Sequence, residues 1–262
     1  MNSFGPATST ATYVYCVGYA QALSDKSPPF SVRGIGGTND PLRVITFDDL
    51  AAVVSDAPAT RLDITRENLL AHERVVTEAL QRSSVLPVAF GMVALNDDEV
   101  REKLLAREFE ELHRQLDSVY ACVELDLRVL WQRDQLFARI AEENDQIRAL
   151  RDELADRDPD TAYYERIQLG ELTAAAIDAL RDEDSAAILA SLEPLAIETK
   201  LNPNLTDMMI VNAAFLLANE QIPEFDAAVQ ALGASASDRL HFQYVGPLAP
   251  YNFVNVSVDW EE

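Results

Sequence analysis

Cysteine and lysine are scarce in this chain, and each shortage limits what the protein can be. Its 262 residues include two cysteines, Cys16 and Cys122, and three lysines, Lys26, Lys103 and Lys200. Two cysteines alone cannot make a structural metal site, and because both lie in apolar, strand-like stretches we expect two buried, reduced thiols. Few lysines combined with an excess of acid are typical of a salt-adapted host or of a GC-rich genome, and both explanations stay open.

Long apolar runs are missing as well. No stretch approaches the roughly 20 apolar residues that a membrane-spanning helix needs. The opening residues, MNSFGPATSTA, contain no lysine or arginine and no apolar core of signal-peptide length. We therefore expect a soluble, cytoplasmic protein.

Positive charge is also in short supply. The chain has 44 Asp and Glu residues against 21 Lys and Arg, which gives a formal net charge of −23. Phosphates of nucleic acid and anionic lipid headgroups would be repelled, so neither nucleic acid nor a membrane is an expected partner. The composition is otherwise ordinary, with 48% hydrophobic residues, and the length allows one large or two modest domains.

Motifs of catalysis and cofactor binding are absent from the sequence. Gly34, Gly36 and Gly37 do not form a dinucleotide-binding pattern, and no Walker-type loop, nucleophile elbow, CxxC pair or calcium loop occurs. Acidic groups fall at predicted helix starts or on solvent faces, and we interpret them as solvated. They include residues 97–98, 142–143 and 182–184. We therefore predict that the protein is not an enzyme, has no catalytic or metal-binding residues and uses no cofactor.

The three histidines do not suggest a metal site either. His72 falls on or beside a predicted helix stripe, His113 on the flank of another helix and His241 on a strand face. No two of them approach a cysteine or carboxylate in a metal-ligand spacing. We interpret His72 as structural, with a partly buried and hydrogen-bonded ring, while its neighbour Glu73 leaves an interface role open.

Apolar periodicity in the first half predicts a separate α+β unit. The expected strands are 12–19, 42–47, 50–55 and 85–91. One helix is expected over about 65–83 and another from Asn96, where Glu99 completes a capping box. The inner stripe of the first helix is Leu69, Val76 and Leu80. The inner face of the second is Val100, Leu104, Leu112, Leu116 and Val119.

The second half has the order β-α-β-β-α-β, which is the ferredoxin-like arrangement. Its expected strands are 123–131, 195–201, 208–218 and 239–245. A long helix over 133–157 and a second helix starting at Asp158 and Pro159 enlarge the first crossover into a helical hairpin, which a short helix at 184–192 extends. The last helix is expected to begin near Pro223 and to stop at Gly233.

We therefore expect an α+β fold of two domains. Residues 1–120 form the N-terminal α+β domain, in which 1–11 are flexible. Residues 121–246 form the ferredoxin-like domain, and residues 247–262 form a C-terminal tail.

One face of the second sheet is predicted to carry mixed charge. Its expected members are Glu124, Asp126, Arg128, Glu198, Lys200, His241 and Gln243. Such a face fits protein contact better than a catalytic pocket. A plain solvated face, or one covered by the protein's own tail, remains open.

The end of the chain, residues 244–254 with the sequence YVGPLAPYNFV, is chemically unusual. Its conformationally restricted positions are Gly246, Pro247 and Pro250, and its large rings are Tyr244, Tyr251 and Phe253. The restricted residues cannot extend a regular helix or a central strand, and free termini seldom carry such rings unburied. We expect an ordered, rigid segment that packs on something.

This segment resembles the end of the gas vesicle protein F/L family, whose members close on a similar pattern of Gly-Pro, Pro-Tyr and an aromatic residue. A second stretch, VLPVAFG at 85–91, is similar to that family's short apolar strand ending in Phe-Gly. The pair His72-Glu73 and the stretch NAAFLL at 212–217 are shorter matches. The resemblance covers most of the chain, from about Tyr13 to Val254.

The resemblance implies an accessory or minor structural protein of gas vesicles, located in the gas vesicle and cytoplasm. It implies binding to the small hydrophobic shell protein and to other accessory proteins. We expect this binding to prevent aggregation of the shell protein during vesicle nucleation. It also implies a modified ferredoxin-like C-terminal domain. A highly charged partner with an apolar docking surface could cover the shell subunit's apolar patch while repelling its own copies.

We place the partner-binding contact on two groups of residues. The first group is Pro87, Phe90 and Gly91, and the second is Gly246, Pro247, Pro250, Tyr251 and Phe253. A purely architectural role, with turns fixed by Gly and Pro and rings in the core, remains open. Another class also remains open: a ferredoxin-like enzyme or small-molecule sensor with a pocket between the domains.

Overall fold

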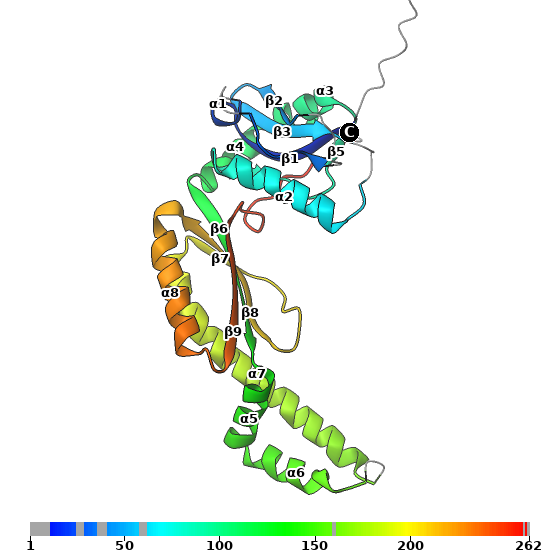
Figure 1. Ribbon diagram of the computed structural model, residues 1–262, viewed down its shortest axis with the longest axis vertical. Coiled ribbons are helices and arrows are strands. Elements are labelled where there is room, and N and C mark those ends of the chain that lie inside the picture. Colours follow the sequence, from blue (N-terminus) through cyan, green and yellow to red (C-terminus); the bar gives the residue numbers. More distant parts are fainter. Residues whose placement is uncertain are drawn as a thin grey trace, which may run out of the picture. The chain divides into compact units, whose positions relative to one another are not determined.

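The computed structural model describes residues 11–24, 29–35, 41–57, 62–158, 161–258 and 260 (Figure 1). Several positions singled out above lie outside these ranges: residues 1–10, Lys26, Gly36, Gly37 and Pro159. The chain divides into two compact units. Unit 1 comprises residues 1–124 together with 246–262, and unit 2 comprises residues 125–245. The C-terminal segment therefore groups with the N-terminal half.

Unit 1 contains a sheet with the strand order β2-β3-β1-β4, and β5 also pairs with β1. Its strands are β1 (Thr12–Tyr19), β2 (Arg43–Phe47), β3 (Leu50–Asp56), β4 (Val85–Pro87) and β5 (Val93–Ala94). The predicted hairpin of β2 and β3 is confirmed, and Asp48 in its turn has a φ of 51°. Residues 13–17 of β1 are fully buried, because β1 pairs antiparallel with β3, β4 and β5 in the middle of the sheet.

Helices of unit 1 pack their apolar sides inward. They are α1 (Ala20–Leu23), α2 (Arg66–Leu80), α3 (Asp97–Glu99), the π-helix η2 (Val100–Ala106) and α4 (Phe109–Ser118). The predicted start at Asn96 is confirmed, since its side chain accepts from the Glu99 N–H at 2.9 Å and Glu99 accepts from the Leu95 N–H at 2.7 Å. The predicted inner face from Val100 to Val119 is at most 2% exposed.

The predicted inner stripe of α2 is wrong at Leu69, which is 42% exposed. The buried stripe is instead His72, Val75, Val76 and Ala79. These residues recur at three- and four-residue spacing, so they share one face of the helix. Leu69 lies one turn before the stripe, near the start of the helix, and remains half exposed.

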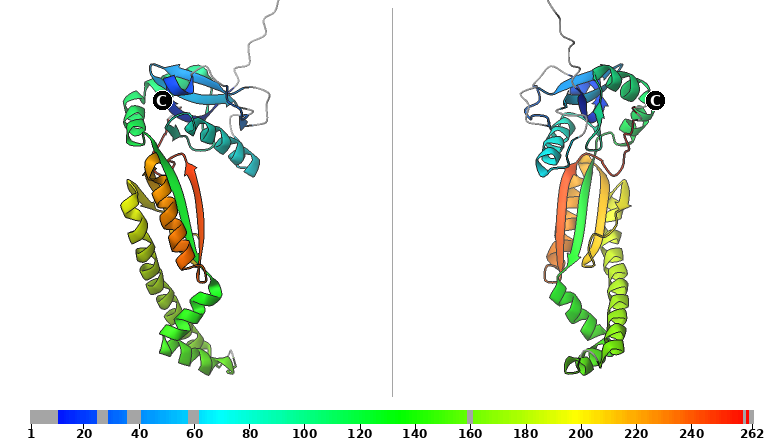
Figure 2. Two further views of the ribbon diagram at one scale, coloured as in Figure 1. Left: turned by 60° about the vertical axis from the view of Figure 1, so that its left-hand side comes forward. Right: turned by 90° about the vertical axis from the view of Figure 1, so that its right-hand side faces the viewer.

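Unit 2 confirms the ferredoxin-like prediction. Its sheet has the order β7-β8-β6-β9. Across the sheet, the second strand of the unit is therefore followed by the third, the first and the fourth. The strands are β6 (Cys122–Trp131), β7 (Glu198–Leu201), β8 (Met209–Ala218) and β9 (Leu240–Leu248). Helices α7 (Tyr163–Leu192) and α8 (Ile222–Ser235) lie on the same side of this sheet (Figure 2). The 3-10 turns η3 (Glu193–Leu195) and η4 (Asn219–Gln221) connect the elements.

Several predicted boundaries in unit 2 are wrong. The expected single helix over 133–157 is two helices, α5 (Arg133–Glu143) and α6 (Asp145–Ala155), because Asn144 leaves the helical region at φ −127° and ψ 97°. The Asn144 side chain accepts from the Ile147 N–H at 3.1 Å, and asparagine is a preferred N-cap. The next helix begins at Tyr163 and runs unbroken to Leu192, and α8 continues two residues past Gly233. Strand β9 extends to Leu248 through Pro247, which an edge strand tolerates.

The solvated interpretation of residues 182–184 is wrong for Asp184, which is 7% exposed. Its carboxylate accepts from Trp131 Nε1 at 2.7 Å and from the Nη1 atoms of Arg139 and Arg239, each at 3.2 Å. The four-residue spacing of the buried residues of α7 explains the position. These residues are Leu180, Asp184, Ile188 and Leu192. The carboxylate thus ties α7 to β6, to α5 and to the residue before β9.

Other polar members of the second sheet behave as the sequence predicts. Arg128, Glu198, Lys200, His241 and Gln243 are exposed, and Asp126 is partly exposed. No helix in the described ranges is both long and apolar enough to span a bilayer.

Candidate functional site

The two family-like stretches of the sequence meet in unit 1 around one histidine. We call this group the His72 cluster and define it as Tyr13, His72, Glu73, Phe90 and Tyr251. Strand β1 supplies Tyr13, and α2 supplies both His72 and Glu73, as adjacent residues. Phe90 follows β4, and Tyr251 belongs to the C-terminal segment.

A continuous chain of hydrogen bonds runs through the cluster. The Gly91 N–H donates to Tyr13 Oη at 3.1 Å, and Tyr13 Oη lies 2.9 Å from His72 Nδ1. His72 Nε2 lies 3.1 Å from Tyr251 Oη, which donates to Glu73 Oε2 at 3.2 Å. Because the single Tyr251 hydroxyl proton is donated to Glu73, the Tyr251 oxygen accepts from His72 Nε2–H. His72 is then a neutral ring whose Nδ1 accepts from Tyr13.

Ring contacts enclose the histidine on several sides. Tyr15 stacks on His72 at 5.6 Å between ring centroids, while Tyr13 and Phe90 approach its ring edge-on at 5.7 and 6.0 Å. His72 is 3% exposed and Tyr13 is fully buried. The predicted structural character of His72, a buried and hydrogen-bonded ring, is therefore confirmed.

Burial keeps the His72 ring and the phenols of Tyr13 and Tyr251 uncharged at physiological pH. It lowers the pKa of His72 to about 4, against the opposing effect of a backbone hydrogen bond with Val88. Burial also raises the pKa of Tyr251, and the nearby charge of Glu73 raises it further. The pKa of Glu73 is raised by burial, while its hydrogen bond from Tyr251 acts the other way. Both nitrogens of His72 and the hydroxyls of Tyr13 and Tyr251 are already hydrogen-bonded. The arrangement is therefore better suited to holding the C-terminal segment in place than to transferring protons.

The remaining candidate residues lie outside this hydrogen-bond chain. Pro87 and Pro250 are buried, whereas Gly246 and Pro247 are exposed at the end of β9. Phe253 is half-buried, and its N–H donates to the Pro250 carbonyl at 3.0 Å in a tight turn. The structure thus brings Phe90 and Gly91 together with Tyr251.

A second set of hydrogen bonds holds the C-terminal segment through Glu124, which is 1% exposed. Its carboxylate accepts from the backbone N–H and the side-chain Nδ2 of Asn252, both at 2.7 Å. At Glu124 the sheet face is therefore not open, and the alternative that the sequence left open, a face covered by the protein's own tail, is the one observed. Gln115 exchanges hydrogen bonds with the backbone of Asn255 at 2.9 and 3.1 Å. Residues 249–256 are thus an integral part of unit 1.

Sequence patterns assign Glu124 only as a strand residue, so this partner of the segment could not be predicted. Glu124 and His72 are each joined to the segment across more than a hundred residues of sequence, and such distant pairs leave no local periodicity. The adjacent pair His72-Glu73 was the only sign in the sequence of a buried polar contact here, because a histidine on an apolar stripe needs a buried polar partner.

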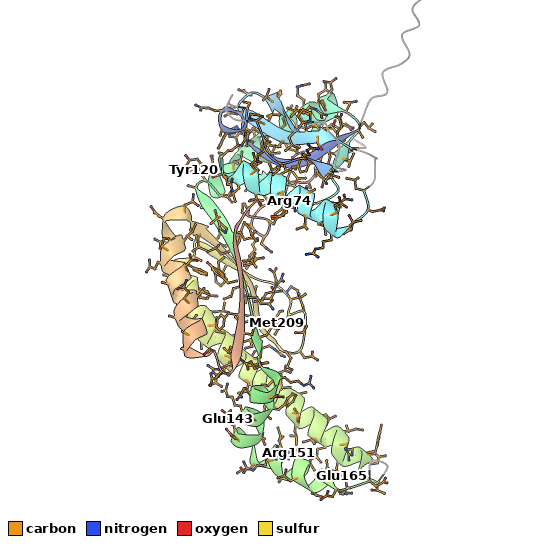
Figure 3. All side chains as sticks on the ribbon, in the orientation of Figure 1. Arg74, Tyr120, Glu143, Arg151, Glu165 and Met209 are labelled. Atoms are coloured by element: carbon orange, nitrogen blue, oxygen red, sulfur yellow. The ribbon has the colours of Figure 1, made fainter. Side chains whose placement is uncertain are left out.

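Two open depressions flank the exposed side of α2. One of 370 Å³ is lined by residues that include Leu70, Glu73, Arg74 and Thr77, and one of 490 Å³ is lined by residues that include Arg74 and Gly34. Arg74, labelled in Figure 3, belongs to both linings. Both linings mix polar and apolar residues.

Metal binding receives no support from the parts of the chain that can be described. No group of three or more His, Cys, Asp or Glu residues there could hold a metal ion. Cys16 and Cys122 are both free and buried, as predicted.

Replacing Gly91 by alanine is expected to lower the free energy of unfolding by about 1 kcal/mol. Gly91 has a φ of 96°, and an added Cβ would meet no atom within 4 Å, so the effect is purely conformational. Gly170→Ala is the matched control, since Gly170 lies inside α7 with equally open space, and alanine there should stabilise by about 1 kcal/mol. Urea unfolding measures the stability of both variants. Equal effects at the two positions would refute the conclusion that the positive φ of Gly91 requires glycine.

Comparison with known proteins shows similarity along nearly the whole chain. A family model described as gas vesicle synthesis protein GvpL/GvpF matches residues 11–255. Gas vesicle protein F of Streptomyces sp. (strain CB03234) is 34% identical over 245 residues, which cover 93% of this chain and 99% of that protein. Gas vesicle protein F of Dolichospermum flosaquae is 23% identical over 91% of this chain and 97% of its own length.

Solved structures agree in fold. The crystal structure of GvpF from Anabaena sp. PCC7120 has a TM-score of 0.80 at 23% identity and covers 95% of this chain and 100% of that one. GvpF from Microcystis aeruginosa has a TM-score of 0.74 at 26% identity, with coverage of 93% and 98%.

Proposed function

This chain belongs to the GvpL/GvpF family of gas vesicle synthesis proteins, and on that basis we propose that it binds the small hydrophobic shell protein during vesicle assembly. Binding covers the apolar surface of the shell subunit and keeps it from aggregating before it is incorporated. Contacts with other gas vesicle accessory proteins, in the cytoplasm and at the vesicle, belong to the same proposal. The family match over residues 11–255 is the observation that carries it.

We place the docking surface at the His72 cluster and the neighbouring end of β9. Phe90 is half-buried, Gly91 is exposed, and Leu69 on α2 is 42% exposed one turn before Glu73. Helical spacing puts Leu69 on the same side of α2 as Glu73, which receives the Tyr251 hydrogen bond. Exposed apolar groups around a rigidly held ring cluster are a suitable site for an apolar partner.

Within this surface, the candidate residues have two roles. The exposed and half-exposed members contact the shell protein: Phe90, Gly91, Gly246, Pro247, Tyr251 and Phe253. The buried prolines, Pro87 and Pro250, hold the backbone that presents them. This division follows from exposure, because a fully buried side chain cannot reach a partner without local unfolding.

Introducing a charge on this surface is expected to weaken shell-protein binding by about tenfold, which corresponds to about 1.4 kcal/mol. The variants are Leu69→Glu and Pro247→Glu, and the matched control is Tyr164→Glu, an 81% exposed ring in unit 2. Quantitative co-purification with the shell protein measures the effect, and far-UV circular dichroism checks folding.

Point variants are preferable to removing residues 246–262. Ala249 and Val256 are buried in unit 1, so a truncation after Val245 would damage the fold itself. Failure of the wild-type protein to retain any shell protein would overturn the binding proposal. Loss of binding in Tyr164→Glu alone would move the docking surface to unit 2.

We further propose that the protein has no catalytic activity. The relatives reported above are named as gas vesicle proteins, and the phenols and histidine of the His72 cluster are all engaged in hydrogen bonds. Native mass spectrometry of the purified protein tests this proposal, because a stoichiometric bound metabolite would favour an enzyme or sensor instead.

A further inference from the structure

Strand β7 lies at one edge of the unit 2 sheet, where β8 is its partner strand. The residues around it are unusually exposed for a strand. Ile197 is 61% exposed and Leu201 is 63% exposed, and the side chains of Glu198 and Lys200 are 53% and 45% exposed. An edge strand with large apolar side chains in solvent is a template for pairing with another strand.

The outer edge of β7 presents the backbone groups of alternate residues. The Asn202 N–H donates to the Asn212 carbonyl at 2.7 Å, in the antiparallel register that pairs Lys200 with Ala214 and Glu198 with Leu216. Because hydrogen-bonded pairs alternate along such a ladder, Glu198 and Lys200 point their backbone groups toward β8. The N–H and carbonyl of Thr199 therefore point outward, whereas the Ile197 N–H donates to the Leu216 carbonyl at 2.8 Å and does not belong to the outer edge.

The sequence of this edge is complementary to itself. Residues 197–201 read Ile-Glu-Thr-Lys-Leu, so the order of apolar, acidic, neutral, basic and apolar side chains is matched when the strand is reversed. In an antiparallel pair of two copies centred on Thr199, Glu198 lies opposite Lys200 of the second copy and Lys200 lies opposite its Glu198. Leu201 then lies opposite Ile197 of the second copy.

We propose that the outer edge of β7 pairs with the same edge of a second copy of this chain, antiparallel and centred on Thr199. The result is a two-fold dimer in which the sheets of two units 2 join into one. Such a contact is isologous, because the same residues serve on both sides. It goes beyond shell-protein binding and does not depend on it.

Charge supports a second copy as the occupant. A lysine on an edge strand normally prevents pairing, because its charge would lie against apolar or basic side chains of the incoming strand. Here the second copy supplies a glutamate opposite each lysine, and opposite charges across a strand pair attract. Within one chain Lys200 Nζ lies 3.8 Å from Glu198 Oε1, so each carboxylate is already within reach of an ammonium group on this face.

The net charge of −23 opposes association but does not prevent it. At about 0.15 M salt the screening length is about 8 Å, so only charges close to the joined edges act directly. A contact of five residues from each copy is small, and we expect a reversible, concentration-dependent dimer.

Charge reversal at the edge tests the proposal directly. Glu198→Lys places lysine opposite lysine twice in the dimer, and Lys200→Glu places glutamate opposite glutamate twice. Each single variant should dimerise about tenfold more weakly than wild type, although the two variants shift the net charge in opposite directions. The double variant Glu198→Lys/Lys200→Glu restores both cross-strand pairs and should recover wild-type dimerisation.

The two single variants also provide an internal control when they are mixed. Glu198→Lys and Lys200→Glu chains form two opposite-charge pairs with each other, so the mixture should dimerise where neither variant does alone. Sedimentation velocity over a concentration series measures all five samples, and circular dichroism checks folding. A wild-type protein that stays monomeric throughout, or a dimer that both single variants leave unchanged, would overturn the proposal.

Discussion

Asp184→Ala is expected to lower the free energy of unfolding of unit 2 by about 3 kcal/mol. Asp184 has 8% of its side chain exposed and accepts from the Trp131 indole at 2.7 Å. Removing the carboxylate leaves that buried N–H without its acceptor and leaves Arg139 and Arg239 without their shared partner. Denaturant unfolding followed by tryptophan fluorescence measures the loss, because Trp131 reports on this site.

Two further variants distinguish the effect of losing the contacts of Asp184 from the effect of removing one negative charge. Asp182→Ala removes the same charge from the exposed side of the same helix and should change the stability by no more than about 0.5 kcal/mol. Asp184→Asn keeps an acceptor for Trp131 but loses the attraction to the arginines, so its effect should fall between the two. If Asp184→Ala and Asp182→Ala proved equally mild, the buried carboxylate would not hold these elements together.

The parts of the fold that were predicted are those with a local cause. Strand β6 alternates apolar and polar residues, and the helix starting at Asn96 has its cap and its inner face within a few turns of each other. Apolar periodicity and helix capping involve residues that are close in sequence, so both can be recognised from the sequence alone. The ferredoxin-like order of unit 2 follows once these elements are placed in sequence.

The parts that were missed depend on partners distant in sequence or on competing signals. Asn144 interrupts a helical pattern because its side chain caps the next helix, although the apolar stripe continues on both sides of it. Asp184 looks solvated within an acidic run, yet its four-residue spacing from Leu180 and Ile188 was an available sign of burial. Helical spacing therefore deserves priority over local charge when such residues are assigned.

The candidate site was predicted in its residues but not in its arrangement. The restricted backbone and large rings of residues 244–254 predict an ordered segment, and the structure has Tyr251 partly buried against His72. No periodicity indicates which element a segment without regular structure will contact. Only the matching of donors and acceptors in three dimensions identifies His72 and Glu73 as the partners of Tyr251.

Acidification is expected to weaken unit 1 through His72, by about 2 kcal/mol between pH 7 and pH 5. The folded pKa of about 4 lies below the ordinary value of 6.5, so between these values the unfolded chain binds more protons than the folded one. Stability therefore falls as the pH drops below 6.5 and levels off below about 4. Glu73 acts in the opposite direction, because its raised pKa favours the folded state as the pH falls.

A double-variant comparison isolates the histidine from Glu73 and from the other carboxylates. The reference protein carries Glu73→Gln, so that Glu73 no longer titrates against His72. The protein compared with it is the double variant Glu73→Gln/His72→Gln. The reference should lose about 2 kcal/mol more than the double variant when the pH is lowered from 7 to 5. His241→Gln, at an exposed position on β9, is the control for removing a histidine that has no such burial. Urea unfolding at a series of pH values provides the measurement. Parallel pH profiles for the reference and the double variant would mean that His72 is not held neutral by its burial between Tyr13 and Tyr251.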